Sequence, residues 1–282
     1  MTGGALRFPS ERIARVTFEQ RLLAKVNDNA PELFKEFRGA VSGTELRLTT
    51  RVRDWDKYKN LCDSAKASET PIHAIHLTKF FLNRENSTEE IAGLVSHIND
   101  LVKYISPKVL VLHSTFGDID TILRNYAAVL DHIPTDLILA IENLNNRGTV
   151  LFDLKGMEDF VKAIQKLPEN LKICVDAAHL RIRSPETYTK DIIEFIDIAG
   201  KRLGHLHLSD RTLGGDARGE KSKKHVPCGS GMIDWSELIS HINDAPEGVR
   251  ATVEVKPENE TAQAVASISY LKELASRISL KI

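Results

Sequence analysis

The segment Leu137–Asn143 reads LILAIEN, an unbroken apolar run that ends in a glutamate and an asparagine. A short continuous apolar run is typical of a strand that is buried on both faces of a parallel sheet. Five further runs have the same character: Ile72–Leu77, Val109–Leu112, Leu171–Val175, Leu203–Leu208 and Arg250–Val255. Two weaker runs precede them, and they are interpreted as a first strand over Arg12–Phe18 and a second over Thr44–Leu48.

Helical patterns lie between these runs. The clearest one begins at Ser87, where the sequence Ser-Thr-Glu-Glu is typical of a capping box at a helix N-terminus. The expected helices are Ser87–Ile105, Ile122–Leu130, Leu154–Leu167, Thr187–Ile198, Trp235–Ile242 and Glu260–Ile278. Regular alternation of strand and helix predicts an α/β fold with a parallel sheet, and eight units predict one closed (β/α)₈ TIM barrel over residues 1–282. The alternative is a doubly wound open sheet, but the Gly-rich phosphate turn of that fold is missing after the first strand.

The composition limits the cellular location and the binding partners that we expect for the protein. The formal net charge of -1 provides no overall attraction to nucleic acid or to an anionic membrane. The three cysteines, Cys62, Cys174 and Cys228, form no CxxC pair, which argues against a disulfide framework. Met1–Ser10 lacks the apolar core of a secretory signal, and no apolar run is long enough to span a membrane. We therefore expect a cytoplasmic protein without a membrane partner, and a homo-oligomer is compatible with the sequence.

Polar side chains with metal-binding chemistry stand at or near the ends of six consecutive apolar runs. The carboxyl ends of barrel strands meet at one face, where the active sites of such enzymes lie. Buried carboxylates crowded together repel each other unless a cation lies among them. The mixture of ligands suits a divalent ion and does not distinguish Mn²⁺, Mg²⁺, Co²⁺, Fe²⁺ and Zn²⁺. The six residues are His76, His113, Glu142, Asp176, His207 and Glu254.

The histidine pair on one strand can be ranked by geometry. His205 and His207 are two residues apart, so both side chains point to the same side of the sheet. His207 lies about 6–7 Å nearer the carboxyl end of the strand. We therefore expect His207 to be the ligand and His205 to lie in the layer beneath it.

Five motifs together resemble the xylose isomerase-like barrel superfamily, which includes sugar isomerases and epimerases and endonuclease IV. The similarity covers residues 70–257. The motifs are IEN (141–143), VDAAH (175–179), GHLHLSD (204–210), HVPCGSGMIDW (225–235) and TVE (252–254). The resemblance implies that one metal ion is shared by Glu142, Asp176, His207 and Glu254. It also implies that Glu142 and Glu254 exchange protons on opposite faces of the substrate.

The two branches of this superfamily imply different roles for the remaining histidines. In the epimerase branch, the residue matching His179 contacts substrate oxygens. In the endonuclease branch, residues matching His76, His113, His179 and His225 hold further metal ions. There an aspartate stands two residues before the histidine that matches His225, and this chain has Lys223 in that place. The departure weakens the case for a third metal ion and for nuclease activity.

The segment Arg211–His225 is rich in basic residues and follows the seventh apolar run, so we expect it to overhang the site. It carries Arg211, Arg218, Lys221, Lys223 and Lys224 against Asp216 and Glu220. Such a segment suits an anionic substrate, but it contains no aromatic residue to stack on bases. A solvated surface loop is the alternative reading of the charge run.

The sequence thus predicts a metal-dependent isomerase or epimerase. Its partner would be a small sugar or sugar phosphate, and its reaction would be proton transfer through a metal-stabilised enediolate. Substrate contacts are assigned to His76, His113, His179, Arg211 and His225. The alternative is an endonuclease IV-like phosphodiesterase, a hydrolase that would act on abasic DNA. A barrel that binds metal without turnover is the third hypothesis.

Overall fold

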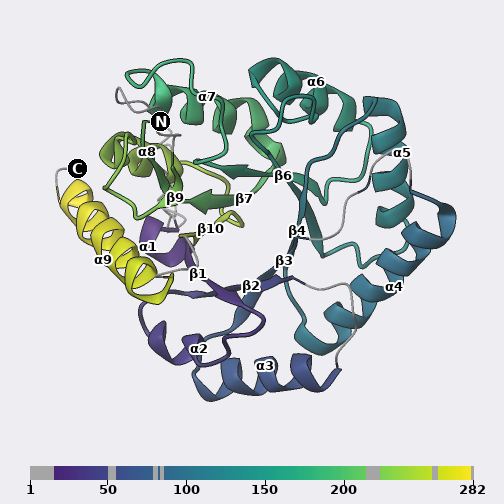
Figure 1. The fold of residues 1–282 in the computed structure, drawn as a ribbon, viewed down its shortest axis with the longest axis horizontal. Coiled ribbons are helices and arrows are strands. Elements are labelled where there is room, and N and C mark those ends of the chain that lie inside the picture. The colour runs from purple at the N-terminus through teal and green to yellow at the C-terminus, as the bar shows by residue number, and fades with distance from the viewer. Residues whose placement is uncertain are drawn as a thin grey trace, which may run out of the picture.

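Eight parallel strands close into a barrel with helices around it, as Figure 1 shows in a view into the ring. The computed structural model describes residues 16–49, 55–78, 82, 86–213, 223–255 and 260–280. Neighbouring strands follow the order of the chain, and the last one pairs with the first, so the predicted TIM barrel is confirmed. The barrel strands are β1 (Leu22–Asn27), β2 (Gly43–Leu48), β3 (Ile72–Leu77), β4 (Val109–His113), β5 (Ile138–Glu142), β6 (Leu171–Asp176), β7 (Leu203–Leu208) and β10 (Arg250–Val253).

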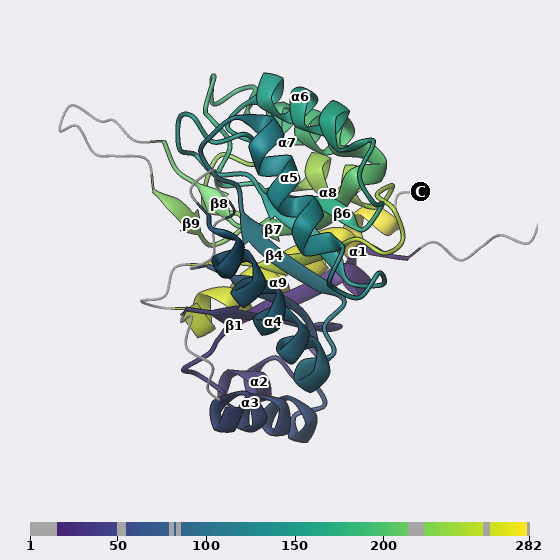
Figure 2. The same ribbon diagram turned by 90° about the vertical axis from the view of Figure 1, so that its right-hand side faces the viewer.

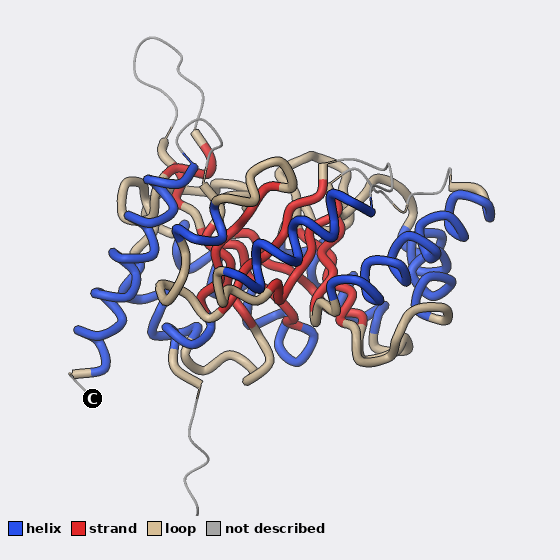
Figure 3. Tube along the Cα trace, turned by 90° about the horizontal axis from the view of Figure 1, so that it is seen from below, coloured by secondary structure: helices blue, strands red, loops and turns tan. Residues whose placement is uncertain are grey.

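The helices form the outer ring, and in Figure 3 they enclose the strands. Helix α9 packs beside α1 and α2, which closes the ring between the two ends of the barrel sequence (Figure 1). The expected cap at Ser87 is present, since its side chain accepts a hydrogen bond from the backbone of Glu90. The helices are α1 (Phe18–Arg21), α2 (Leu33–Glu36), α3 (Trp55–Ala67), α4 (Thr88–Ile105), α5 (Ile119–Leu130), α6 (Leu154–Ile164), α7 (Tyr188–Ala199), the 3₁₀ turn η1 (Gly200–Arg202), α8 (Trp235–Ile242) and α9 (Glu260–Ser279).

The predicted first strand is wrong. Residues 12–15 of Arg12–Phe18 lie outside the described residues, and Phe18 begins helix α1. The Gln20 side chain accepts a hydrogen bond from the backbone N–H of Thr17, and this contact favours a helical turn there. The first strand is β1, whose apolar pattern is interrupted by Lys25. The weaker prediction for the second strand, Thr44–Leu48, is confirmed as β2.

Two apolar layers hold the fold together. The larger one fills the space between the barrel and the helices. The smaller one lies inside the barrel and consists of Leu23, Ala74, Val109, Val111, Ala140 and Cys174. Because side chains alternate across a strand, residues two positions further along also point inward. The inner layer is therefore the floor on which the candidate site stands.

A buried arginine fastens the segment between α6 and β6. The Arg202 guanidinium donates hydrogen bonds to the carbonyls of Ile164, Leu167, Pro168 and Leu171 at 2.8–3.1 Å. Arg202 stands just before β7, at the end of the barrel opposite the strand carboxyl ends. It therefore stabilises the fold without contacting the candidate site.

We expect Arg202→Met to lower the free energy of unfolding by about 2–4 kcal/mol, because several buried carbonyls lose their donor. Urea unfolding measures this loss, and metal content should stay unchanged. Lys201→Met, an exposed neighbour, is the matched control. A urea midpoint like that of the control would show that water can replace the guanidinium without a loss in the free energy of unfolding.

A short antiparallel ribbon stands outside the barrel. Strands β8 (Asp210–Arg211) and β9 (Lys224–Val226) form it, and it lies to the left of the barrel in Figure 2. The middle of the basic segment predicted to overhang the site, residues 214–222, lies outside the described residues. Among the described helices, none has the length and apolar character that crossing a membrane requires.

Candidate metal centre

The candidate site is the layer of side chains directly above the apolar floor of the barrel. On four strands the floor residue is followed two positions later by a polar one, as Ala74 is by His76. The same step leads from Val111 to His113, from Ala140 to Glu142 and from Cys174 to Asp176. On β7 the step leads from His205 to His207, and beside β10 it leads from Thr252 to Glu254. Strand alternation thus brings together the residues that the sequence predicted as metal ligands.

Three carboxylates converge on a single nitrogen of His207. Nδ1 of His207 lies 3.1 Å from Glu254 Oε2, 3.5 Å from Glu142 Oε1 and 3.9 Å from Asp176 Oδ2. His207, Glu142 and Asp176 are almost completely buried, whereas Glu254 is 13% exposed. One face of the cluster is therefore open to a small ligand, and Glu254 lies on that face.

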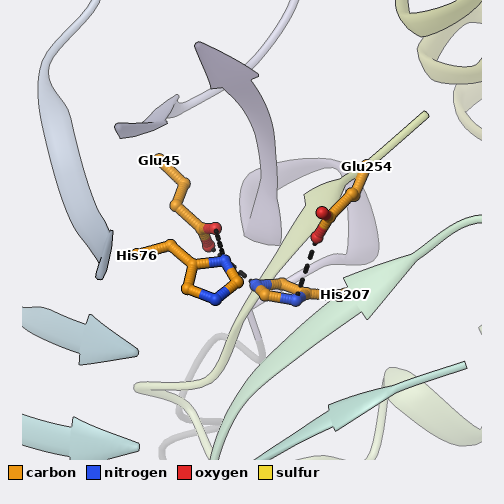
Figure 4. A group of neighbouring side chains, drawn as sticks. All are labelled: Glu45, His76, His207 and Glu254. Carbon is orange, nitrogen blue, oxygen red and sulfur yellow. Dashed lines mark hydrogen bonds and ion pairs between the residues drawn. The ribbon is translucent and has the colours of Figure 1, made fainter. Parts of the chain in front are cut away.

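The opposite nitrogen of His207 is held by Glu45, as Figure 4 shows. His207 Nε2 lies 3.0 Å from Glu45 Oε2, which also accepts a hydrogen bond from Thr252 and contacts Nε2 of His205. A carboxylate only accepts hydrogen bonds, so Nε2 of His207 carries the proton. In the neutral ring Nδ1 then carries the lone pair that could bind a metal ion, and Glu45 fixes the ring orientation that such a ligand needs.

The orphaned atoms of the cluster fit a divalent cation. Among the described residues, Glu142 Oε2, Asp176 Oδ2 and His207 Nδ1 are buried and lack a hydrogen-bond partner. Leaving such atoms unsatisfied costs about 1–3 kcal/mol each. A metal ion coordinated by Glu142, Asp176, His207 and Glu254 would satisfy them together.

The electrostatic balance of the site also favours a cation. Burial alone would lower the pKa of His207, but Cys174 and the carboxylates of Glu45 and Glu142 outweigh it and hold that pKa well above its ordinary value. Burial alone would raise the pKa of Glu142, but His207 and His76 bring it well below the ordinary value. Glu142 is therefore held ionised beside a positively charged His207, and a metal ion that binds Nδ1 would replace the proton there.

The histidines predicted to contact substrate lie in two pairs around this centre. His76 and His113 pack edge to face with ring centroids 4.8 Å apart, and both approach Glu142. His179 and His225 also pack edge to face, and their Nε2 atoms are 3.1 Å apart. His179 Nδ1 lies 3.1 Å from Glu142 and 3.3 Å from Asp176, so both pairs border the proposed ligands.

The structure places Arg211 in a supporting position. Its guanidinium donates to the backbone carbonyls of Ala178 and Leu180, and the residue is buried. Its neighbour Asp210 accepts hydrogen bonds from Gly229, Ile233 and the indole of Trp235. These contacts fasten the segment that carries His225, which leaves the predicted role of Arg211 in substrate binding as an untested expectation.

Two residues of the site were missed from the sequence, Lys25 and Glu45. Both point into the barrel, and the Lys25 ammonium lies 3.1 Å from Glu45 Oε1 and contacts Glu254. Each interrupts an apolar strand pattern with a charge, and that interruption is the signal that could have revealed them.

We expect Glu45→Gln to weaken metal binding by about 10- to 100-fold, since outer partners of metal-bound histidines have effects of that size. A glutamine can present its amide group to His207 and allow the wrong tautomer. Competition against a chelating dye measures the affinity for Mn²⁺. Glu69→Gln, an exposed glutamate paired with Arg38, is the control and should bind like the natural protein. Unchanged affinity in the Glu45→Gln variant would show that Glu45 does not position His207.

The parallel barrel, with buried carboxylates and imidazoles at its carboxyl-end face, places this chain among barrel proteins that have a candidate metal centre. This chain belongs to the xylose isomerase-like TIM barrel family, whose sequence profile matches residues 37–274.

Individual relatives are more distant. A D-psicose 3-epimerase of Enterocloster bolteae is 33% identical over 110 residues, which is 39% of this chain and 30% of that protein. The structure is similar to that of endonuclease IV from Thermus thermophilus, with a TM-score of 0.62, 12% identity, and 90% and 99% of the two chains covered. A xylose isomerase-like barrel protein from Mycobacterium smegmatis, in complex with magnesium, has a TM-score of 0.67 and 10% identity, with 93% and 99% covered. The matched segment is under a third of the epimerase, and the two structural likenesses concern the fold alone.

Proposed function

We propose that the protein is a metal-dependent isomerase or epimerase acting on a sugar or sugar phosphate. The observation that carries the proposal is the convergence of Glu142, Asp176 and Glu254 on Nδ1 of His207. Two of these carboxylates belong to motifs that resemble the proton-transfer groups of the epimerase branch. The partial similarity to a D-psicose 3-epimerase supports the same reading.

The chemistry needs an acidified C–H bond and two proton carriers. A bound divalent ion would polarise the carbonyl and adjacent hydroxyl oxygens of the substrate. Glu254 then accepts the proton from the carbon next to the carbonyl, which gives an enediolate. In epimerisation Glu142 would first take up a proton from water and then deliver it to the other face of that carbon, while Glu254 would return its own proton to water. His113 and His179 are 19% and 15% exposed and border the proposed ligands, so substrate oxygens can reach their rings.

A phosphodiesterase remains the second candidate because of one observation. His76, His113 and Glu142 form a further group with metal-binding geometry, and so do Asp176, His179 and His225. The second of these groups uses Asp176 in place of the carboxylate that the sequence lacks at Lys223. An endonuclease IV-like reaction would need ions in these groups as well as in the central one.

Two assays on the protein loaded with Mn²⁺ distinguish the candidates. Incubation with ketoses and ketose phosphates in ²H₂O should place deuterium on the carbon next to the carbonyl, as NMR would detect. A DNA duplex with one abasic site should stay intact under the same conditions. Cleavage without deuterium exchange would replace the proposal by the phosphodiesterase. Bound metal without either reaction would support a barrel that binds metal but does not catalyse.

A further inference from the structure

Lys25 occupies a place inside the barrel that is otherwise suited to a metal ion. Glu45, His76, His207 and Glu254, drawn in Figure 4, form a group whose ligand atoms lie within 4.8 Å of one another. The Lys25 ammonium contacts three of the four residues. Its Nζ is 2.9 Å from His76 Nδ1 and 3.1 Å from Glu45 Oε1, and it donates a hydrogen bond to Glu254 Oε2.

We propose that the Lys25 ammonium takes the place of a second metal ion, so that the site holds one divalent ion only. This inference rests on the metal centre of the proposed function. Lys25 is 3% exposed and has two carboxylates as partners, so it is a fixed part of the barrel interior. An ammonium group has three donors and no acceptor, which matches the three groups that surround it.

The first argument concerns the protonation of His76. Because the ammonium can only donate, Nδ1 of His76 must accept, and in the neutral ring the proton then lies on Nε2. Nε2 faces Glu142 Oε2 at 3.1 Å. A metal ion bound by Nε2 would move the proton to Nδ1, where it would point at the ammonium. Lys25 therefore keeps the His76 proton on Nε2, the nitrogen that lies near Glu142, and opposes a metal ion between His76, His113 and Glu142.

The second argument is charge. Four carboxylates surround the centre: Glu45, Glu142, Asp176 and Glu254. One divalent ion together with Lys25 leaves one negative charge on the cluster. A second divalent ion would turn the cluster positive, and its attraction to the carboxylates would compete with the nearby ammonium. Without Lys25, two divalent ions would balance the four carboxylates.

The histidines around the centre therefore have different roles. His207 would bind the metal ion, whereas His113, which is partly exposed, would face the substrate. One metal ion is enough for proton transfer next to a carbonyl. The hydrolysis of a phosphodiester by clustered ions needs further metal ions beside the first. Lys25, which the family motifs do not include, thus favours the isomerase over the phosphodiesterase.

Metal stoichiometry tests the inference without any substrate. The purified chain is stripped with chelator, titrated with Mn²⁺, and examined by mass-spectrometric metal analysis and by electron paramagnetic resonance. The natural protein should bind one tight Mn²⁺ per chain, with the spectrum of an isolated ion. Lys25→Met, which keeps an unbranched side chain one atom shorter and removes the charge, should bind two, with the broadened spectrum of two interacting ions. Lys172→Met is the control, since the Lys172 ammonium donates a hydrogen bond to the backbone carbonyl of Lys201, at the end of the barrel opposite the site.

Lys25→Gln, which keeps a donor but has no charge, is measured in parallel in case the methionine variant fails to fold. Two tight ions in the natural protein would overturn the inference and leave the metal centre in place. One ion in each folded variant would overturn it as well. No tight ion in the natural protein would instead overturn the proposed metal-dependent function, and these failures are therefore distinguishable.

Discussion

Glu254→Gln should lower kcat by about 10³-fold or more, which is within the range measured for the loss of a general acid–base group. Glu254 is the most exposed of the carboxylates around His207 and lies on the open face of the cluster. It is also in contact with Lys25, which together with His207 outweighs burial and lowers the pKa of Glu254. It is thus an ionised base within reach of a substrate. Glutamine keeps the shape but cannot accept the proton.

The measurement is the rate of deuterium exchange into the substrate, together with a melting curve and metal analysis of the variant. Circular dichroism should show an intact barrel. Glu237→Gln, in the exposed first turn of α8, should react like the natural protein. Turnover near the natural rate in the Glu254→Gln variant would show that another group moves the proton.

Metal removal should lower the melting temperature by roughly 5–10 °C. An ion present at about 1,000 times its Kd stabilises the native state by about 4 kcal/mol, and a domain of this size shifts by about 2 °C per kcal/mol. The physical reason is the buried cluster of carboxylates, which repel each other when no cation lies among them. Differential scanning calorimetry with and without chelator measures the shift.

Asp176→Asn provides the matched control for this effect. The variant loses one proposed ligand and one negative charge, so its melting temperature should respond little to chelator. A natural protein whose melting temperature does not change after verified removal of metal would show that no tight site exists at this cluster.

The sequence predicted the barrel because most of its strands are apolar on both faces and carry no competing signal. Leu137–Ile141 and Leu203–Leu208 match β5 and β7 to within a residue. The first strand was misplaced because Lys25 interrupts the apolar run of β1, while Arg12–Phe18 offers the apolar residues Ile13, Val16 and Phe18. Local pattern could not reveal that the lysine is neutralised by Glu45 and Glu254, residues distant in the sequence.

Prediction of the site from the sequence was limited in the same way. Strand ends indicated Glu142, Asp176 and His207, because convergence at one barrel face follows from topology alone. Glu45 lies deeper in its strand, and its importance arises from contact with His205 and His207, which come from the other half of the chain. The pairing of His179 with His225 likewise depends on how the segment after β7 folds back, with His225 in a left-handed conformation at φ 55°. Such contacts require the three-dimensional structure.

The central claim is that one divalent ion sits among Glu142, Asp176, His207 and Glu254. A crystal of the protein soaked in Mn²⁺, measured at the manganese absorption edge, tests it most directly. We predict a single strong anomalous peak per chain, bound by Nδ1 of His207 and by the three carboxylates, with Lys25 still in contact with His76. A peak shared by His179 and His225, or a pair of peaks that includes one at His76 and His113, would contradict this account.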